Sequence, residues 1–271
     1  MFLRLHRLAA ALLLSIFCIS SSAAANPGTA VQKKFEPETL NYKVMYKWGL
    51  INKQAGHASL ALTHDSRHYH AQLTAASEPW ADKFFKVRDT LNGRMTYADF
   101  TPLFYEKIAH EGKDHKHDVV RYDCSVPGTV SAKCTRKVTS KGQAKVDEER
   151  EMQSEGAAVD MLTSFYYMRR LPFNEWIPGH INKIDIFSGK RKELLSITYN
   201  GIEDVDIDGR RIPAYHVTFT FTSKGGAKTS DDMEAWIAAD ESRIPLRMEG
   251  NLPVGKVRCF FTGKSKAPSK K

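Results

Sequence analysis

Two His-x-His pairs are the residues of this chain whose spacing could bind a metal ion. His68 and His70 lie two residues apart, and His115 and His117 repeat that spacing. On a β-strand such residues point to the same face, so each pair could supply two ligands and a neighbouring strand a third. The alternative is that they are ordinary solvent-facing strand residues. The position of His68 and His70 on the polar side of an alternating segment favours this alternative.

The cysteines could form a covalent link. Cys124 and Cys134 flank Pro127-Gly128, a turn signal, so a hairpin would place the two thiols nearly opposite each other. A disulfide between them would close a short loop and stabilise the fold by about 2–3 kcal/mol. Cys259 lies in an apolar stretch and is expected to be a buried free thiol.

A buried ion pair is the third interaction that the residue types suggest. Phe85, Val87 and Asp89 share one face of an alternating segment, which places a carboxylate among apolar side chains. Because a buried charge is tolerated only when it is paired, we expect Asp89 to have a cationic partner. Arg169, at the end of a predicted helix, is the candidate for a structural Asp89–Arg169 pair.

Motifs of known catalytic sites are missing from the sequence. It contains no Gly-x-Ser-x-Gly, no His-Glu-x-x-His, no phosphate-binding glycine loop and no Cys-x-x-Cys. The acidic residues at 147–149 and 203–204 fall in predicted turns, where solvated carboxylates are the default. The basic residues are not interleaved with aromatics as they are in nucleic-acid-binding proteins. The sequence thus favours a non-enzymatic protein with no catalytic residues, no cofactor and no nucleic-acid partner.

The first 25 residues have the layout of a secretory signal peptide. Arg4 and Arg7 precede the apolar run Leu8–Ile19, and small residues follow up to Ala25. The run is shorter than the about 20 residues of a membrane-spanning helix. We therefore expect a signal peptide at 1–25, cleaved near Ala25, and a periplasmic protein that does not span the membrane. The full chain has 271 residues and a formal net charge of +9, with several lysines near its ends.

Alternation of apolar and polar residues predicts that most of the chain forms β-strands. The segment 156–171 instead carries apolar residues at three- and four-residue steps, which predicts a helix. We expect a mainly β fold in which a large curved antiparallel sheet, a half-barrel or barrel-like, wraps around one central α-helix. The expected organisation is a flexible lead-in at 26–38, a single β-rich domain at 39–262 and a disordered basic tail at 263–271.

Large aromatic residues spread along the chain could line a pocket inside such a sheet. A partly filled half-barrel leaves an apolar cavity suited to an acyl chain or another lipid-like ligand. The alternative is a plainly packed core, since large aromatic side chains pack more often than they line pockets. The candidate pocket residues are Trp48, Trp80, Phe84, Phe85, Tyr166 and Trp236.

Several short motifs, in their order along the chain, resemble those of one bacterial family. They are Trp48-Gly49, Ala55-Gly56, Phe85-Lys86-Val87-Arg88-Asp89, Thr101-Pro102-Leu103, Ser164-Phe165-Tyr166-Tyr167-Met168-Arg169, Trp236-Ile237-Ala238-Ala239-Asp240 and Ile244-Pro245-Leu246. The family is the exported domain of unknown function 3108, and the resemblance spans about residues 40–261. The resemblance implies a fold similar to the half-barrels of periplasmic lipoprotein carriers, and it carries over no catalytic residues.

These expectations favour one function and leave two alternatives. The favoured function is that of a non-enzymatic periplasmic protein that binds or chaperones a hydrophobic or amphiphilic envelope component, such as a lipid or a lipoprotein-like ligand. The first alternative is a structural protein of the cell envelope that binds another envelope protein. The second is an exported metal-binding protein or hydrolase that uses the histidine-rich strands. The sequence predicts no particular oligomeric state.

Overall fold

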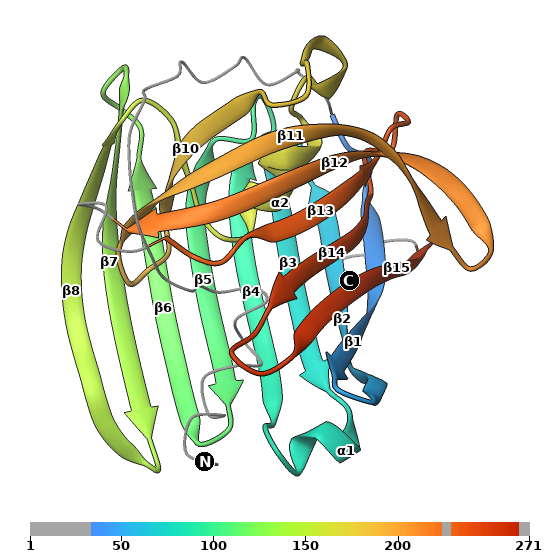
Figure 1. The fold of residues 1–271 in the computed structure, drawn as a ribbon. Helices are drawn as coiled ribbons and strands as arrows, with labels where there is room; N and C mark the ends of the chain where they lie inside the picture. The colour runs from blue at the N-terminus through green and yellow to red at the C-terminus, as the bar shows by residue number, and fades with distance from the viewer. Residues whose placement is uncertain (1–33, 224–228, 266–271) are drawn as a thin grey trace.

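The computed structural model describes residues 34–223 and 229–265, which form one sheet of 15 strands and two short α-helices (Figure 1). The predicted signal peptide lies outside the described residues. The first part of the chain contains β1 (Glu38–Trp48), β2 (Ile51–His64), β3 (His68–Ser77), α1 (Pro79–Asp82), β4 (Val87–Thr96), β5 (Pro102–Glu111), β6 (Asp114–Asp123), β7 (Thr129–Ser140) and β8 (Gln143–Glu155). The second part contains β9 (Ala158–Val159), α2 (Thr163–Arg169), a 3-10 turn (Phe173–Glu175), β10 (Ile181–Phe187), β11 (Lys192–Ile207), β12 (Arg210–Ser223), β13 (Met233–Ala238), β14 (Pro245–Asn251) and β15 (Lys256–Ser265).

Two meanders of antiparallel strands are joined where β1 pairs with β15. The strand order is β8 to β1, then β15 down to β9, so each strand mostly lies beside its neighbours in sequence. The β1–β15 pairing sets Val44 opposite Cys259 and thereby brings the two ends of the domain together. The predicted mainly β fold with a large curved antiparallel sheet is confirmed. The sheet curves into a nearly closed barrel, as Figure 1 shows.

The two edges of the sheet meet at a seam that side chains bridge. Strands β8 and β9 end the strand order on opposite sides, although only two residues separate them in the chain. Across the seam, Arg150 Nη1 donates to the carbonyl oxygen of Lys190 at 2.7 Å, and Ser154 Oγ donates to Asp185 Oδ2 at 2.5 Å. The barrel is thus held together here by side-chain hydrogen bonds in place of a strand ladder.

The predicted helix at 156–171 is shorter than expected. Ala158 and Val159 form β9, which pairs in parallel with β10, and α2 begins only at Thr163. The buried carboxylate of Asp160 sets this start, because it accepts hydrogen bonds from the backbone N–H groups of Leu162 and Thr163. Pro172 follows the helix and prevents its continuation.

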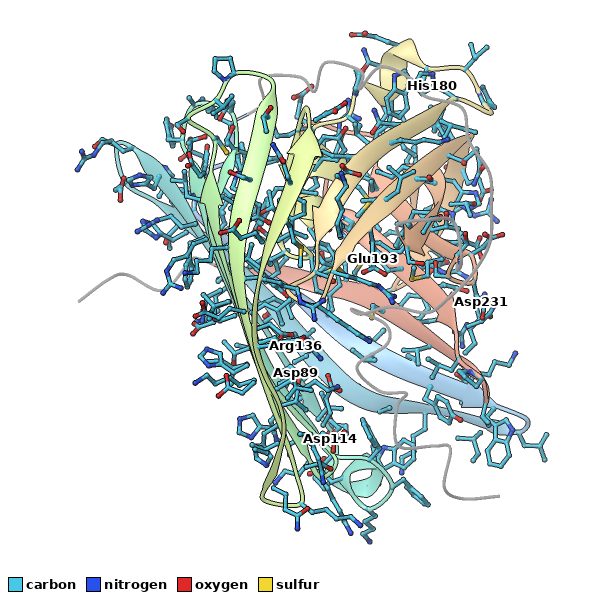
Figure 2. All side chains as sticks on the ribbon, turned by 90° about the vertical axis from the view of Figure 1, so that its left-hand side faces the viewer. Asp89, Asp114, Arg136, His180, Glu193 and Asp231 are labelled. Atoms are coloured by element: carbon cyan, nitrogen blue, oxygen red, sulfur yellow. The ribbon has the colours of Figure 1, made fainter. Side chains whose placement is uncertain are left out.

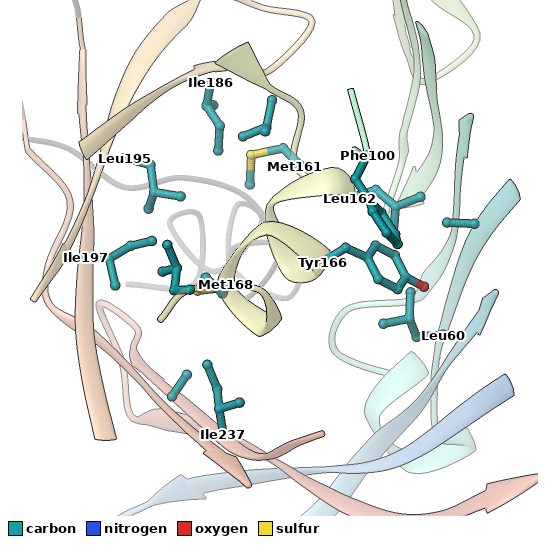
Figure 3. Packing of buried hydrophobic residues seen from close by; sticks show 14 of the residues in the cluster. Leu60, Phe100, Met161, Leu162, Tyr166, Met168, Ile186, Leu195, Ile197 and Ile237 are labelled. Carbon is teal, nitrogen blue, oxygen red and sulfur yellow. The ribbon is translucent and has the colours of Figure 1, made fainter. Parts of the chain in front are cut away.

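The core surrounds α2 inside the barrel. On one side of the helix, Leu162 and Tyr166 lie close to Phe100 and Leu60, and on the other side Met168 faces the strands that carry Ile197 (Figure 3). Tyr166 and Phe100 stack with their ring centroids 5.9 Å apart. The helix and these aromatic rings fill one end of the interior with tightly packed apolar side chains.

The expected Asp89–Arg169 ion pair is wrong, because the two residues have different partners. Arg169 is buried, and its Nη1 lies 2.6 Å from Glu38 Oε1 at the start of β1. Its other guanidinium nitrogens donate to the backbone carbonyl oxygens of Ser242 and Arg243, before β14. One side chain of α2 therefore ties the helix to both meanders.

Asp89 belongs instead to a cluster of charged side chains inside β4–β7. Its Oδ1 accepts a hydrogen bond from the backbone N–H of His110 at 3.1 Å. The buried Lys107 pairs with Glu111 nearby. The same interior sector holds Asp118, whose Oδ1 lies 2.7 Å from Arg136 Nη1. Asp89 and Arg136 can be located in Figure 2. The alternation correctly placed Asp89 on the inner face, but its neighbours there are polar.

Strand β8 and its charges are a second correction. The acidic residues at 147–149 lie on β8 and those at 203–204 on β11, although turns were expected at both places. The acidic residues at 147–149 can lie on a strand because β8 is at the edge of the sheet. It pairs on one side only, with β7, and its exposed face carries charged residues. Charges are typical of an edge strand, because they discourage pairing with another chain. They also hide the alternation on which strand prediction depends.

The domain extends slightly beyond its predicted limits at both ends. Phe35, expected in a flexible lead-in, is buried and packs against Phe100 and Tyr166. Strand β15 continues to Ser265, past the expected boundary at 262. The remainder of the predicted lead-in and basic tail lies outside the described residues.

Replacing Arg169 by Met tests the buried ion pair. The variant keeps a long side chain but removes the Arg169 donor from Glu38 Oε1 and from two carbonyl oxygens, while Lys264 still pairs with Glu38 Oε2 at 2.8 Å. Because one partner of a buried charge is lost, the free energy of unfolding should fall by about 3 kcal/mol. Urea denaturation followed by circular dichroism measures the change. The matched control is Lys137→Met, which breaks the exposed Lys137–Asp147 pair and should change stability by less than about 1 kcal/mol. Equal effects of the two substitutions would contradict the assignment.

Replacing Asp89 by Asn tests the charged cluster through its pH dependence. Burial, together with the nearby Glu111 carboxylate, raises the pKa of Asp89 to about 6. Between pH 4 and 6 the folded protein therefore keeps a proton that the unfolded chain releases, so this contribution to stability is lost as the pH rises. Relative to the wild type, Asp89→Asn should gain about 2 kcal/mol from pH 4 to pH 7 in urea denaturation. The exposed Asp147→Asn variant should show no such trend, and a flat difference for Asp89→Asn would refute the prediction.

Candidate functional site

An open pocket of about 800 Å³ lies at the end of the barrel that carries α1 (Figure 1). Its walls come from both meanders, because β1, β2 and β3 meet β14 and β15 there. The inner end of the pocket is reached by Phe165 of α2. The lining residues are Tyr42, Val44, Tyr46, Trp48, Ile51, Ala55, Gly56, His57, Ala58, Ser59, Leu60, Leu73, Ala75, Ala76, Ser77, Trp80, Ala81, Phe84, Val87, Phe165, Met248, Leu252, Pro253, Val254, Gly255, Val257 and Cys259.

The pocket exists because the inward side chains of β2 and β3 become smaller toward this end. Successive inward residues of a strand are two apart. Near α2 they are large, as at Leu60 and Leu73, whereas toward the mouth they are Ala58 and Ala75. Ala58 and Ala75 lie directly opposite each other on the paired strands. The Ala58–Ala75 pair is much smaller than the Leu60–Leu73 pair beside it, and the volume that it does not fill is open space.

Close backbone contacts shape the same wall. A Cβ atom on Gly56 would lie 2.5 Å from the carbonyl oxygen of Ala76, so only glycine fits between β2 and β3 at this point. The register of β1 and β2 shifts beside Gly56, between Val44 and Met45. Such a bulge bends and twists a strand locally. The Ala55-Gly56 motif therefore shapes the pocket wall through its backbone.

The lining is chemically suited to hydrocarbon. The described residues that line the pocket include no Asp, Glu, Lys or Arg. Two of the polar groups at its edge are already paired, since Tyr46 Oη donates to the carbonyl oxygen of Val254 and Trp80 Nε1 donates to that of Gln54. The Trp80 bond also anchors α1 to β2. The buried hydroxyl of Tyr42 has no hydrogen-bond partner among the described residues, and burial raises its pKa, so it remains a protonated donor.

Three of the six predicted pocket residues line this pocket. Trp48, Trp80 and Phe84 lie at its mouth. The rings of Trp80 and Phe84 meet edge to face, with their centroids 6.3 Å apart. The residues that the sequence did not suggest are the small ones of β2 and β3 and those of the β14–β15 turn at 252–255. A run of small residues at alternate positions could have indicated the former. Nothing in the sequence places the turn beside them, because the β1–β15 pairing is long-range.

The other three predicted pocket residues pack elsewhere. Phe85 lies against the turn at Gly112, and Tyr166 is fully buried in the core between Phe35 and Phe100. Trp236 stacks on His216 at 4.5 Å and donates its Nε1 hydrogen to Glu203, on the face of β13 opposite to Ile237. For these residues the alternative of ordinary packing is correct.

The histidine pairs do not converge on a set of metal ligands in the described part of the chain, which contains no group of three or more suitable side chains. His68 and His70 both lie beside the carboxylate of Asp65 at the end of their strand. On the outer face of β6, His117 Nε2 is 2.8 Å from Glu106 Oε1. His115 instead packs against the ring of His110.

The predicted Cys124–Cys134 disulfide does not form in the structure, where both thiols are free. The β6–β7 register places Cys134 opposite Val120 and points it into the core. Cys124 lies beyond the end of β6, four positions further along, which corresponds to roughly 13 Å. The hairpin does turn at Pro127-Gly128, but this turn lies three residues after Cys124 and six before Cys134, so the two thiols are out of register. Cys259 is also free, as expected, and lines the pocket.

The family model described as protein of unknown function (DUF3108) matches residues 41–262. This match covers nearly the whole barrel. The chain belongs to the DUF3108 family. No curated protein sequence matches this DUF3108 protein. None of the helices in its described residues has the length and apolar character needed to cross a bilayer.

Three solved structures are similar to this DUF3108 protein over most of its length. A beta-barrel-like protein of domain of unknown function DUF1849 from Brucella abortus aligns with a TM-score of 0.55 and 10% identity, covering 87% of this chain and 99% of that one. A putative exported protein with a YmcC-like fold from Bacteroides fragilis aligns with a TM-score of 0.38 and 8% identity, covering 88% of this chain and 100% of that one. The hypothetical lipoprotein YmcC from Escherichia coli aligns with a TM-score of 0.30 and 8% identity, covering 88% and 90%. The first of these similarities supports the fold.

Alkylation of the native protein tests the state of the cysteines. Burial raises the pKa of Cys259 to about 12 and that of Cys134 to about 11, so both are almost entirely protonated and unreactive at pH 8. Burial also raises the pKa of Cys124, but its thiol is exposed. Iodoacetamide without reductant should therefore modify Cys124 first, as read by peptide mass spectrometry, and all three thiols at similar rates in urea. Reactivity of Cys124 only after reduction would contradict the free thiols and indicate a disulfide.

Proposed function

We propose that this DUF3108 protein is a periplasmic, non-enzymatic binder of an amphiphilic envelope lipid or lipoprotein, whose acyl chain occupies the pocket. The observation that carries the proposal is the combination of about 800 Å³ of open space with a lining free of charged side chains. Ligand pockets typically measure about 300–1,000 Å³ and bury most of their ligand. The curved sheet and α2 supply a rigid wall and floor for such a ligand.

Binding energy in this pocket would come from removing hydrocarbon from water. Each buried methylene group contributes about 0.8 kcal/mol, so ten of them contribute about 8 kcal/mol before the costs of association. The open end leaves the polar part of an amphiphile in solvent, where no charge has to be buried. The Tyr42 hydroxyl would donate a hydrogen bond to an ester or carboxyl oxygen that reached it. This division of roles requires no catalytic residue and no cofactor.

Neither alternative function has comparable support. A protein partner that added a strand at the β8 edge would meet a row of charged side chains, among them Glu149 and Glu151, which oppose such pairing. Three of the four paired histidines lie beside surface carboxylates, His115 packs against His110, and none of the four lines the pocket. Export to the periplasm is proposed from the signal-peptide pattern at 1–25.

Filling the pocket tests the proposed function directly. In the double variant Ala58→Phe, Ala75→Phe, two rings project from the paired strands β2 and β3 into the pocket. Affinity for a dansyl-labelled fatty acid should therefore fall at least tenfold in fluorescence titration. Ala144→Phe, on the exposed face of β8, adds one ring of the same size outside the pocket and should leave the affinity unchanged.

Lipid recovered from protein purified from the periplasm, measured by mass spectrometry, supplies the second readout. We expect an acyl-chain lipid to co-purify with the wild type and with Ala144→Phe but not with the filled variant. Equal probe binding by the filled variant, with thermal unfolding confirming that it is folded, would refute the pocket as the site.

A further inference from the structure

Large apolar side chains project into solvent around the mouth of the pocket. Trp48 is 55% exposed, Leu50 105% and Phe84 66%, and Ile51 is also exposed. We call these four residues the apolar rim. Three of them line the pocket as well, so the rim continues the apolar wall outward. Because these side chains are in water, they do not contribute the hydrophobic free energy that burial would give to stability.

The turn that carries Leu50 has no structural need for a large apolar residue. Only Gly49 and Leu50 connect β1 to β2, and Gly49 adopts the positive φ of 54° that the turn requires. The Leu50 side chain is fully exposed and therefore contributes nothing to the core. Its position suits a surface that receives apolar side chains. The turn lies at the same end of the barrel as α1 and the β14–β15 turn (Figure 1).

Positive charge flanks the apolar rim on two sides, at the β1–β2 turn and beside α1. Lys47 and Lys53 flank the turn, and Lys83 and Lys86 flank Phe84; all four side chains are exposed. None of the four forms a salt bridge within the described part of the chain. Lys53 Nζ lies 5.0 Å from the ring centroid of Trp80, which places its charge beside the mouth. The local acids Glu78 and Asp82 already contact His57 and Arg88 respectively.

Exposed apolar side chains flanked by lysines without salt bridges match the chemistry of an anionic lipid bilayer. Apolar residues enter the boundary between headgroups and acyl chains, while lysine ammonium groups remain at the phosphates. Anionic lipids attract such lysines over about one Debye length.

We propose that the apolar rim docks this protein on an anionic lipid bilayer, with Leu50 inserted and the four lysines at the headgroups. This proposal rests on the proposed function, because it makes the mouth of the lipid pocket face the bilayer. It adds that the lipid ligand enters the pocket from the bilayer. The occupant of the rim is the bilayer itself, and a second protein copy or another protein is the competing outcome.

Vesicle flotation of the mature protein tests the docking. Wild type should bind vesicles of phosphatidylethanolamine and phosphatidylglycerol far better than vesicles of phosphatidylcholine, and salt should weaken binding. Leu50→Asp should lower the partition coefficient at least about tenfold. Lys53→Gln and Lys83→Gln should each lower it about fivefold at low salt. Val126→Asp is the matched control, because Val126 is an apolar turn residue, 61% exposed, at the opposite end of the barrel.

Probe binding in solution separates this proposal from the proposed function. Leu50→Asp leaves the pocket walls intact, so it should bind the dansyl-labelled fatty acid as the wild type does. Normal probe binding with vesicle binding that is insensitive to Leu50, or equal on both kinds of vesicle, would overturn docking and leave the pocket in place. Failure of the wild type to bind the probe would overturn the proposed function. Rim-dependent dimers in light scattering, without vesicle binding, would assign the rim to a second copy.

Discussion

A nearly closed sheet of 15 strands encloses more space than its own inward side chains can fill. The interior of this protein has three regions that differ in what fills them. One end is filled by α2 and the rings stacked around Tyr166 and Phe100. The sector inside β4–β7 holds paired charges such as Lys107 and Glu111. The remaining end is left open, and its small inward residues make it a pocket. The pocket is therefore the unfilled part of one continuous interior.

The filled end determines how deep the pocket is, because α2 supplies its floor through Phe165. A helix of seven residues is too short to hold its position by backbone hydrogen bonds alone. Arg169 fixes it by binding Glu38 of the first meander and two carbonyl oxygens of the second. The contacts of the same helix with Leu60 on one side and Ile197 on the other reinforce that position (Figure 3). The floor thus depends on long-range contacts that also close the barrel.

The sequence predicted what depends on local pattern. Alternation correctly predicted that most of the chain forms β-strands in one curved antiparallel sheet. It failed where the pattern is masked by surface charge, as in β8, or where a single side chain decides, as where Asp160 shortens the helix. Half of the pocket prediction failed for a related reason: the face of β13 that Trp236 occupies depends on pairing with distant strands. The partners of Arg169 and Asp89 were likewise set by contacts between segments far apart in sequence.

The pocket and the apolar rim share Trp48, Ile51 and Phe84, so they form one uninterrupted apolar surface. This continuity separates two properties of ligand exchange. The walls inside the pocket determine affinity, because they decide how many methylene groups leave water at equilibrium. On the proposed route the rim would contact an acyl chain only during its passage, and exposing each methylene to water on the way would add about 0.8 kcal/mol to the barrier. An apolar path from bilayer to pocket removes that part of the barrier. If both proposals hold, the rim would control the rate of transfer, whereas Ala58 and Ala75 would control how tightly the acyl chain is held.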